Sequence, residues 1–210
     1  MSDKKNIIYL THKRLKEAIS ARKKVLLWQL QGKPIPPPHV VKQKIIKDYA
    51  ARFKTDIFIE TGTFMGEMID AVLHSFTQII SVEYDQALAL RAREKFSSCS
   101  RITIIQGDSA AILPQIAAEL REPCLFWLDA HYSGGETGRS DLMTPIVQEL
   151  SILLGDGLPD HVILIDDARE FTGQNNYPSL GEVKEFLAAR RPNWIMQVQD
   201  DIIRIHKPII

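Results

Sequence analysis

The chain has 210 residues, of which 45% are hydrophobic and 25% are charged. This size and composition are ordinary for a globular protein with one α/β domain and a short extension. No apolar run approaches the roughly 20 residues of a membrane span, and the apolar stretch in MSDKKNIIYL is too short for a secretory signal. The two cysteines, Cys99 and Cys124, do not form a CxxC-type metal pair. We therefore expect a cytoplasmic protein that does not enter a membrane.

The formal net charge is zero, but the charges are unevenly distributed. Residues 1–50 contain 12 Lys and Arg against 3 Asp and Glu, and the remainder of the chain has the opposite excess. A basic segment of this kind can bind phosphates or nucleic acid. The simpler interpretation is a solvated helical face that docks on an acidic body.

The basic segment is predicted to be helical. Apolar residues fall near one side of an amphipathic helix over 11–30, and the sequence PIPPP at 34–38 then forms a stiff linker. A short helix over 39–52 leads into the main domain. We therefore divide the chain into an N-terminal extension, 1–52, and a domain, 53–210. The amphipathic helix is compatible with a homodimer.

From residue 55 onward, apolar segments alternate regularly with amphipathic ones. Strands are expected at 55–60, 78–83, 102–106, 124–129 and 161–166. Helices are expected after them at 65–75, 86–96, 109–119, 142–154 and 180–190. The strands are apolar without alternation, which is typical of a sheet with both faces covered by helices. Strands that alternate with helices indicate a parallel, doubly wound sheet.

The end of the chain breaks this alternation. Two strand-like runs, 193–199 and 201–207, have almost nothing between them. Parallel neighbours need a long crossover, so this pair should be antiparallel. The predicted fold class is therefore α/β: a Rossmann-like, doubly wound, mainly parallel seven-stranded sheet with a C-terminal antiparallel hairpin, plus the N-terminal helical extension.

The first predicted strand runs into the segment ETGTFMG. Ligands of open α/β sheets collect beyond the carboxyl ends of the strands. Gly62 lets a ligand approach the backbone, Gly66 allows a tight turn into the next helix, and Thr61 and Thr63 complete the loop. The spacing is G-x-x-x-G and differs from the G-x-G-x-x-G of dinucleotide sites. Moreover, Glu60 would repel a pyrophosphate, and the chain has no P-loop GKS or GKT.

Acidic residues also follow the other predicted strands. Glu83, at the end of the second strand, can accept both hydroxyls of a ribose. Asp108, with Ser109 beside it, can receive an adenine amino group, and Asp129 ends the fourth strand. Any one of these carboxylates can be a simple helix N-cap, but the set forms an acidic pocket. Such a pocket suits a cationic nucleoside, and we expect S-adenosylmethionine (SAM), with Glu60 near its amino and sulfonium groups.

The order of elements from about residue 55 to 207 resembles class I SAM-dependent methyltransferases. Within that class, the segment IETGTFMGEM (59–68) is similar to the macrocin O-methyltransferase family, which acts on sugar hydroxyls of antibiotics. The first 50 residues match nothing in this family.

The resemblance also implies a metal. In that family a divalent ion, usually magnesium, is bound by an aspartate after the fourth strand and by an Asp-Asp pair after the fifth. The matching residues are Asp129, Asp166 and Asp167. The family's general base lies two residues beyond the first of these, where this chain has His131 in place of the family's aspartate. The stretch between Asp129 and Asp166 is also longer than the family pattern.

The leading hypothesis is therefore metal-assisted O-methylation of a small hydroxylated acceptor, sugar-like or natural-product-like. Magnesium lowers the pKa of a bound hydroxyl, and His131 would take the proton. Asp129 would take part in catalysis as well as in binding the cofactor. The alternatives are a nucleic-acid methyltransferase that uses the basic extension, or a non-catalytic cofactor-binding module. No NPPY-type or DPPY-type segment follows the fourth strand, so a nucleic-acid partner is the weaker alternative.

Overall fold

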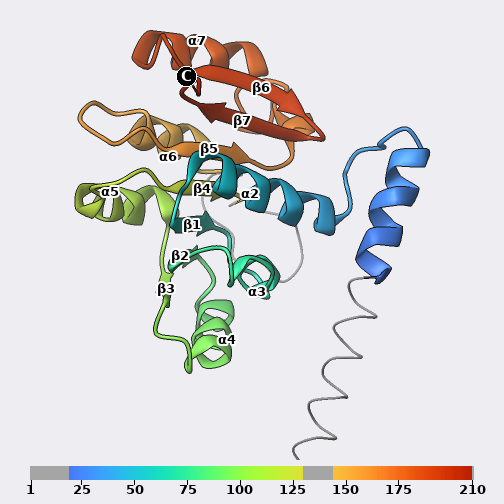
Figure 1. Cartoon of the computed structure of the whole chain (residues 1–210). Coiled ribbons are helices and arrows are strands. Elements are labelled where there is room, and N and C mark those ends of the chain that lie inside the picture. The colour runs from blue at the N-terminus through green and yellow to red at the C-terminus, as the bar shows by residue number, and fades with distance from the viewer. Residues whose placement is uncertain (1–18, 130–143, 210) are drawn as a thin grey trace, which may run out of the picture.

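The computed structural model describes residues 19–129 and 144–209. Its helices are α2 (His39–Phe53), α3 (Glu67–Val72), α4 (Gln86–Phe96), α5 (Ser109–Glu119), α6 (Ile146–Leu153), the 3-10 turn η1 (Ala168–Glu170) and α7 (Leu180–Arg190). Its strands are β1 (Ile57–Thr61), β2 (Gln78–Glu83), β3 (Ile102–Gln106), β4 (Leu125–Leu128), β5 (Val162–Ile165), β6 (Ile195–Gln199) and β7 (Ile202–His206). Figure 1 shows their arrangement, with residues 19–30 as a further helix, in blue, beyond α2.

The seven strands form one sheet in the order β3-β2-β1-β4-β5-β7-β6. β1 to β5 are parallel, whereas β7 pairs antiparallel with both β5 and β6. This architecture confirms the predicted fold class. The last strand of the chain, however, lies inside the sheet and leaves β6 at the edge. β6 is mostly exposed along its length, while every residue of β7 is buried.

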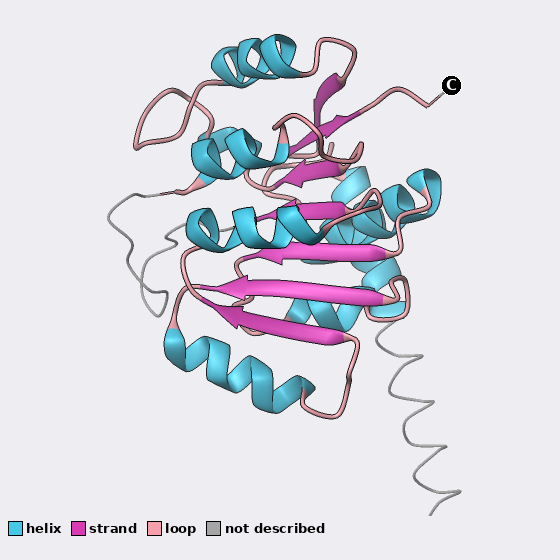
Figure 2. Cartoon of the chain, turned by 90° about the vertical axis from the view of Figure 1, so that its left-hand side faces the viewer, coloured by secondary structure: helices cyan, strands magenta, loops and turns pink. Residues whose placement is uncertain are grey.

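Helices cover both faces of the sheet and make two hydrophobic cores (Figure 2). α5, α6 and α7 pack on one face, and α2, α3 and α4 pack on the other. In β4, Phe126 and Leu128 belong to the first core, while Leu125 and Trp127 belong to the second. Because side chains on both faces are buried, the strand has no polar alternation, as the sequence predicted.

The N-terminal segment is anchored in the second core. Trp28 is buried, and its indole N–H donates a hydrogen bond of 2.8 Å to the carbonyl oxygen of Pro34. α2 begins after Pro38, and its Ile46 is fully buried against the sheet. α2 therefore packs directly on the strands, while the division of the chain at residue 52 stays a prediction.

Most element boundaries agree with the prediction, and the exceptions have local causes. β1 begins two residues later than expected. α3 is shorter than 65–75, because Gly66 adopts a left-handed conformation before it and Ser75 closes a turn after it. The predicted helix over 11–30 is described only from residue 19. Within the described residues, no helix is long and apolar enough to cross a membrane.

Gly66 offers a test of how tightly this loop packs. Its φ is +67°, and a Cβ there would lie 2.6 Å from the ring of Phe96. We expect Gly66→Ala to lower the free energy of unfolding by about 1–3 kcal/mol more than Gly157→Ala. Gly157 is the matched control, since its φ is +78° and nothing lies within 4 Å of an added Cβ. Urea unfolding measures both variants, and equal losses would contradict the predicted clash.

Candidate functional site

The carboxyl ends of the parallel strands meet at one edge of the sheet (Figure 2). Backbone hydrogen bonds extend the ladder just past the strand ends. The N–H of Asp129 donates to the carbonyl of Thr61 at 3.0 Å, and the N–H of Asp166 donates to that of Leu128 at 3.0 Å. The acidic residues that follow β1, β2, β4 and β5 are therefore held at the same edge, as expected for a ligand site of this fold.

The loop after β1 is shaped by two glycines. Gly62 has a φ of +92°, and Gly66, at the start of α3, has a φ of +67°. Between them, Thr63 is buried, and its hydroxyl oxygen lies 2.5 Å from that of Ser81 in β2. Thr61, the last residue of β1, is also buried. Glycine adopts these left-handed conformations without strain, and Phe64 between the two glycines also has a positive φ, of +46°.

Glu60 is almost completely buried beneath this loop, with a relative exposure of 1%. The hydroxyl of Ser81 donates a hydrogen bond of 2.7 Å to its Oε1. Burial raises the pKa of Glu60 to about 8, with smaller contributions in the same direction from the negative charges of Asp129 and Glu83. Without a ligand, Glu60 is therefore largely a neutral acid at pH 7. Its ionised form is stabilised when a cation binds nearby.

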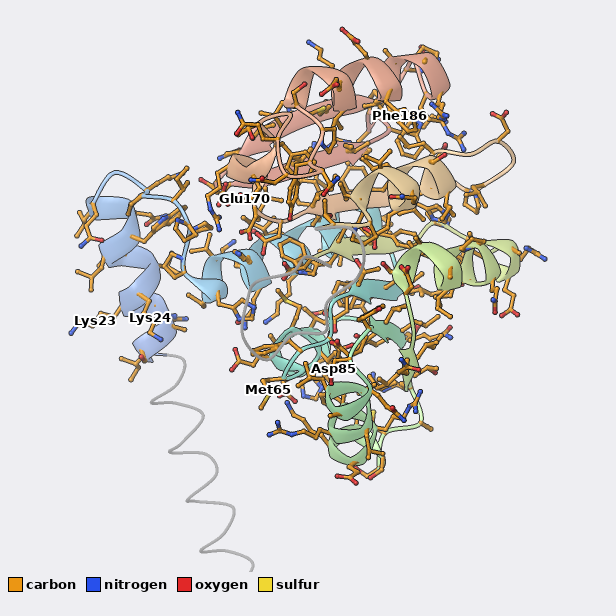
Figure 3. The ribbon with its side chains drawn as sticks, turned by 180° about the vertical axis from the view of Figure 1, so that it is seen from behind. Lys23, Lys24, Met65, Asp85, Glu170 and Phe186 are labelled. Atoms are coloured by element: carbon orange, nitrogen blue, oxygen red, sulfur yellow. The ribbon has the colours of Figure 1, made fainter. Side chains whose placement is uncertain are left out.

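Glu83 joins the loops after β1 and β2. Its Oε2 accepts a hydrogen bond of 2.8 Å from the backbone N–H of Phe64, and its Oε1 accepts one of 2.9 Å from that of Asp85. Each carboxylate oxygen can accept a second hydrogen bond. Glu83 is thus held in place by backbone donors and keeps acceptor capacity for a ligand. Figure 3 labels Met65 and Asp85, which mark these two neighbouring loops.

Asp108 and Ser109 lie where β3 leads into α5. Asp108 is exposed and caps the helix, with its Oδ1 accepting a hydrogen bond of 2.9 Å from the N–H of Ala110. Ser109 is buried, and its hydroxyl hydrogen-bonds to the side chain of Glu149 in α6. Asp108 is therefore the N-cap of α5, as one of the two interpretations of the sequence predicted. Its exposed carboxylate lies at the rim of the candidate site.

Glu149 is a buried acid that the sequence analysis did not single out. Only 1% of its surface is exposed, and burial raises its pKa to about 7. Nearby negative charges on Asp108 and Asp129 act in the same direction, while hydrogen bonding from Ser109 opposes it. The available signal was a lone glutamate in the apolar run PIVQELSILL. Ser81, in β2, was missed for the same reason: it is a small polar residue inside a buried segment.

The predicted metal ligands after β4 and β5 converge, and a lysine lies among them. Lys42, in the first turns of α2, forms an ion pair with Asp166, and its Nζ lies 3.5 Å from Oδ1 of Asp167. Burial tends to lower the pKa of Lys42, but the charges of Asp166, Asp167 and Asp129 together raise it above its ordinary value. Lys42 is therefore a fixed ammonium at this position. Local patterns could not reveal it, because it lies 124 residues from Asp166.

A second cation neutralises Asp167. The Nη1 of Arg169, in η1, donates a hydrogen bond of 2.8 Å to Oδ1 of Asp167 and also pairs with Asp201. The backbone N–H of Arg169 donates to the other oxygen of Asp201 at 2.9 Å. Arg169 is therefore held on both sides, and the aspartate pair after β5 is matched by two cationic side chains.

In this arrangement the residues do not fit a divalent metal ion. Across 19–129 and 144–209, no three His, Cys, Asp or Glu side chains are grouped so that they could hold one. Asp129, Asp166 and Asp167 do approach each other, but the ammonium of Lys42 lies against them. The predicted magnesium site is therefore not supported by the geometry. The proposed base His131 lies outside the described residues.

Comparisons with known proteins support the fold. No protein-family model matches the chain, and no curated protein matches it in sequence. Among solved structures, the O-methyltransferase TomG from Streptomyces achromogenes, involved in tomaymycin synthesis and solved with SAM, matches with a TM-score of 0.59 at 16% identity. The match covers 89% of this chain and 88% of that chain.

Two further structures match over similar lengths. The methyltransferase PaMTH1 from Podospora anserina, solved with S-adenosylhomocysteine (SAH), has a TM-score of 0.58 at 17% identity and covers 94% of this chain and 96% of that chain. An O-methyltransferase from Bacillus cereus, also solved with SAH, has a TM-score of 0.56 at 15% identity and covers 90% of each chain. At these identities the likeness establishes a shared fold.

The burial of Glu60 predicts a dependence of stability on pH. In the folded protein its pKa is raised from 4.5 to about 8, so the folded state holds this proton longer than the unfolded chain. Glu60 therefore makes the free energy of unfolding fall as pH rises from about 5 to 8. The Glu60→Gln variant cannot ionise at this position, so its free energy of unfolding should not fall in this way. By about pH 8 that free energy should exceed the wild-type value by roughly 2–4 kcal/mol.

Urea unfolding of the ligand-free protein at several pH values measures the effect. Glu119→Gln is the control, because Glu119 is an exposed residue of α5. Its stability should follow that of the wild type at every pH. Identical pH profiles for Glu60→Gln and the wild type would show that Glu60 is not a buried neutral acid.

Proposed function

We propose that the protein is a SAM-dependent methyltransferase that methylates a hydroxyl oxygen of a small acceptor. The observation that carries this proposal is the set of carboxylates around the glycine loop. Glu60 lies beneath the loop, Glu83 is bonded to it, and Asp108 lies at the rim beyond β3. Negative charge at the carboxyl edge of a parallel sheet suits a cationic nucleoside and opposes binding of a pyrophosphate.

Each carboxylate has a separate role in this proposal. Glu60 stabilises the positive amino and sulfonium end of the cofactor, because a nearby cation favours its ionised form. Glu83 accepts the ribose hydroxyls with the acceptor capacity that its two backbone hydrogen bonds leave. In this proposal Asp108 and Ser109, at the start of α5, receive the adenine. Thr61, Thr63 and the two glycines supply the backbone turn over which the cofactor lies.

When bound, SAM supplies an electrophilic methyl group on a positively charged sulfur. Transfer of this methyl group would form a C–O bond on the acceptor as the C–S bond breaks, and the hydroxyl proton would pass to a base. The residues of this chain must bind and align the two reactants. Asp129, between the glycine loop and the aspartate pair, is placed to orient an acceptor oxygen. His131 stays the predicted base.

The solved structures that share the fold add support for the cofactor. Three of them are methyltransferases with SAM or SAH bound, and two of these are O-methyltransferases. The macrocin family, and with it a sugar-like or natural-product-like acceptor, is the narrower proposal. It rests on the segment 59–68. Magnesium, which the same resemblance implies, is left out because Lys42 and Arg169 neutralise the aspartates.

A nucleic-acid acceptor is the weaker, second candidate, and it rests only on the basic residues of the N-terminal helix. Lys23 and Lys24 project from the exposed side of the helix over residues 19–30 (Figure 3). Ile19 and Leu30 are also exposed on this helix, at 58% and 74% of their surface. Exposed apolar residues on an amphipathic helix favour the predicted homodimer, so the same surface supports two different partners.

Binding of SAH tests the cofactor proposal. SAH should raise the melting temperature of the protein, whereas NADH should leave it unchanged. Glu83→Gln should weaken SAH binding about 10- to 100-fold, because two charge-assisted hydrogen bonds to the ribose become neutral ones. Isothermal titration calorimetry measures the dissociation constants.

Glu67→Gln provides the control for charge. Glu67 is a carboxylate of α3 with a side chain that is 71% exposed, and its replacement should leave SAH affinity unchanged. Stabilisation by NADH without stabilisation by SAH would overturn the proposed cofactor. Equal affinities in wild type and Glu83→Gln would overturn only the ribose assignment.

The acceptor class can be found by product analysis. We expect release of SAH, and a mass increase of one methylene unit, with polyhydroxylated small molecules such as sugars and catechol-type phenols. A panel that also contains RNA and single-stranded DNA distinguishes the two candidates. Methylation of nucleic acid alone would establish the second candidate and reject the first.

A further inference from the structure

The counter-ion of the aspartates that follow β5 is a lysine of α2, Lys42. The side chain of Lys42 is 12% exposed, while those of Asp166 and Asp167 are 3% and 10% exposed. A carboxyl group this deeply buried either keeps its proton, as Glu60 does, or has a cation close by, because removing charge from water is unfavourable unless the charge is paired. Lys42 meets this need from α2, the helix that precedes the first strand in the chain.

The position of Lys42 is fixed by packing as well as by charge. It lies one turn before Ile46, which is fully buried against the sheet, and next to Val41, which is also buried. The aliphatic stem of a lysine can follow such an apolar surface while its ammonium reaches a polar group. α2 therefore delivers the ammonium to the carboxyl edge as part of the folded core.

A metal ion at this place would first have to displace the ammonium of Lys42. The ammonium of Lys42 pairs with Oδ2 of Asp166, and both Lys42 and Arg169 contact Oδ1 of Asp167. Magnesium binds through oxygen ligands and requires nearly ideal octahedral geometry. Two cationic groups against the same oxygens remove ligand positions and repel a dication.

We propose that the ammonium of Lys42 takes the place of a divalent metal ion at the aspartate cluster, so that this chain works without metal. The inference rests on the proposed function, since it concerns the cation beside the acceptor in methyl transfer. A fixed positive charge there stabilises negative charge that develops on an acceptor oxygen, which is the electrostatic part of a metal ion's role. Lys42 would therefore select acceptors that lose a hydroxyl proton.

The test removes the ammonium and asks whether a metal site appears. Mn²⁺ is the probe, because its free concentration is measured directly by electron paramagnetic resonance. The metal-free wild type should show no stoichiometric Mn²⁺ binding. Lys42→Met keeps most of the side-chain length but not the charge, and it should bind one Mn²⁺ more than about tenfold more tightly than the wild type. Mn²⁺ should also raise the melting temperature of this variant alone.

Two further variants locate the effect. Lys44→Met is the matched control, since Lys44 also pairs with an aspartate from α2 but is 63% exposed; it should behave like the wild type. The double variant Lys42→Met with Asp166→Asn should lose the Mn²⁺ site. Lys42→Arg keeps a cation and should bind no Mn²⁺, so the proposal stays testable if Lys42→Met does not fold.

Stoichiometric Mn²⁺ binding by the wild type, lost in Asp166→Asn, would overturn the proposal and restore the predicted metal site. Failure of Lys42→Met to gain Mn²⁺ while it remains folded would also overturn it. Binding of SAH to the wild type in the presence of EDTA is measured in parallel. Absence of SAH binding both with and without EDTA would reject the proposed cofactor, and SAH binding that is lost only in EDTA would overturn the metal-free proposal.

Discussion

The main physical constraint on this structure is the crowding of carboxylates at the carboxyl edge of its parallel strands. Parallel strands all end on the same side, so acids that are far apart in the chain become neighbours there. Glu60, Glu83, Asp129, Asp166 and Asp167 meet at this edge. Like charges at such short range repel, and the fold is stable only if each charge is neutralised, solvated or matched by a cation.

The protein solves this problem in three ways. Glu60 holds a proton and a hydrogen bond from Ser81. Glu83 stays held by two backbone N–H groups. The aspartates after β5 are matched by Lys42 and Arg169. The cationic side chains therefore neutralise one half of the edge. The other half has no cationic side chain among these contacts: Glu83 accepts only backbone N–H groups, and Glu60 is a neutral acid that can ionise when a cationic cofactor binds.

Sequence patterns predicted the parts of this structure that are local. Strand and helix periods, the glycine loop and the acid at the end of each strand all follow from neighbouring residues. The insertion of β7 between β5 and β6 does not, because a hairpin in the sequence leaves open which of its strands joins the sheet. The partner of Asp166 was equally hidden, since Lys42 belongs to a segment with no pattern that points to the site. The buried acid Glu149 was missed because burial of a single polar residue in a helix is decided by tertiary packing.

Within the described residues, two lysines of the basic N-terminal segment pair with aspartates of the acidic remainder: Lys33 with Asp200 and Lys42 with Asp166. The basic N-terminal residues and the acidic remainder meet through Lys42, which crosses from α2 to the strand ends. A domain that began at residue 53 would contain all of the carboxylates at the site but would lack this cation. α2 also contributes buried residues to the second core, so its removal would expose apolar surface together with an unpaired acid. α2 therefore contributes both to the core and to the carboxyl ends of the strands, where the charge of Lys42 offsets that of the buried aspartates.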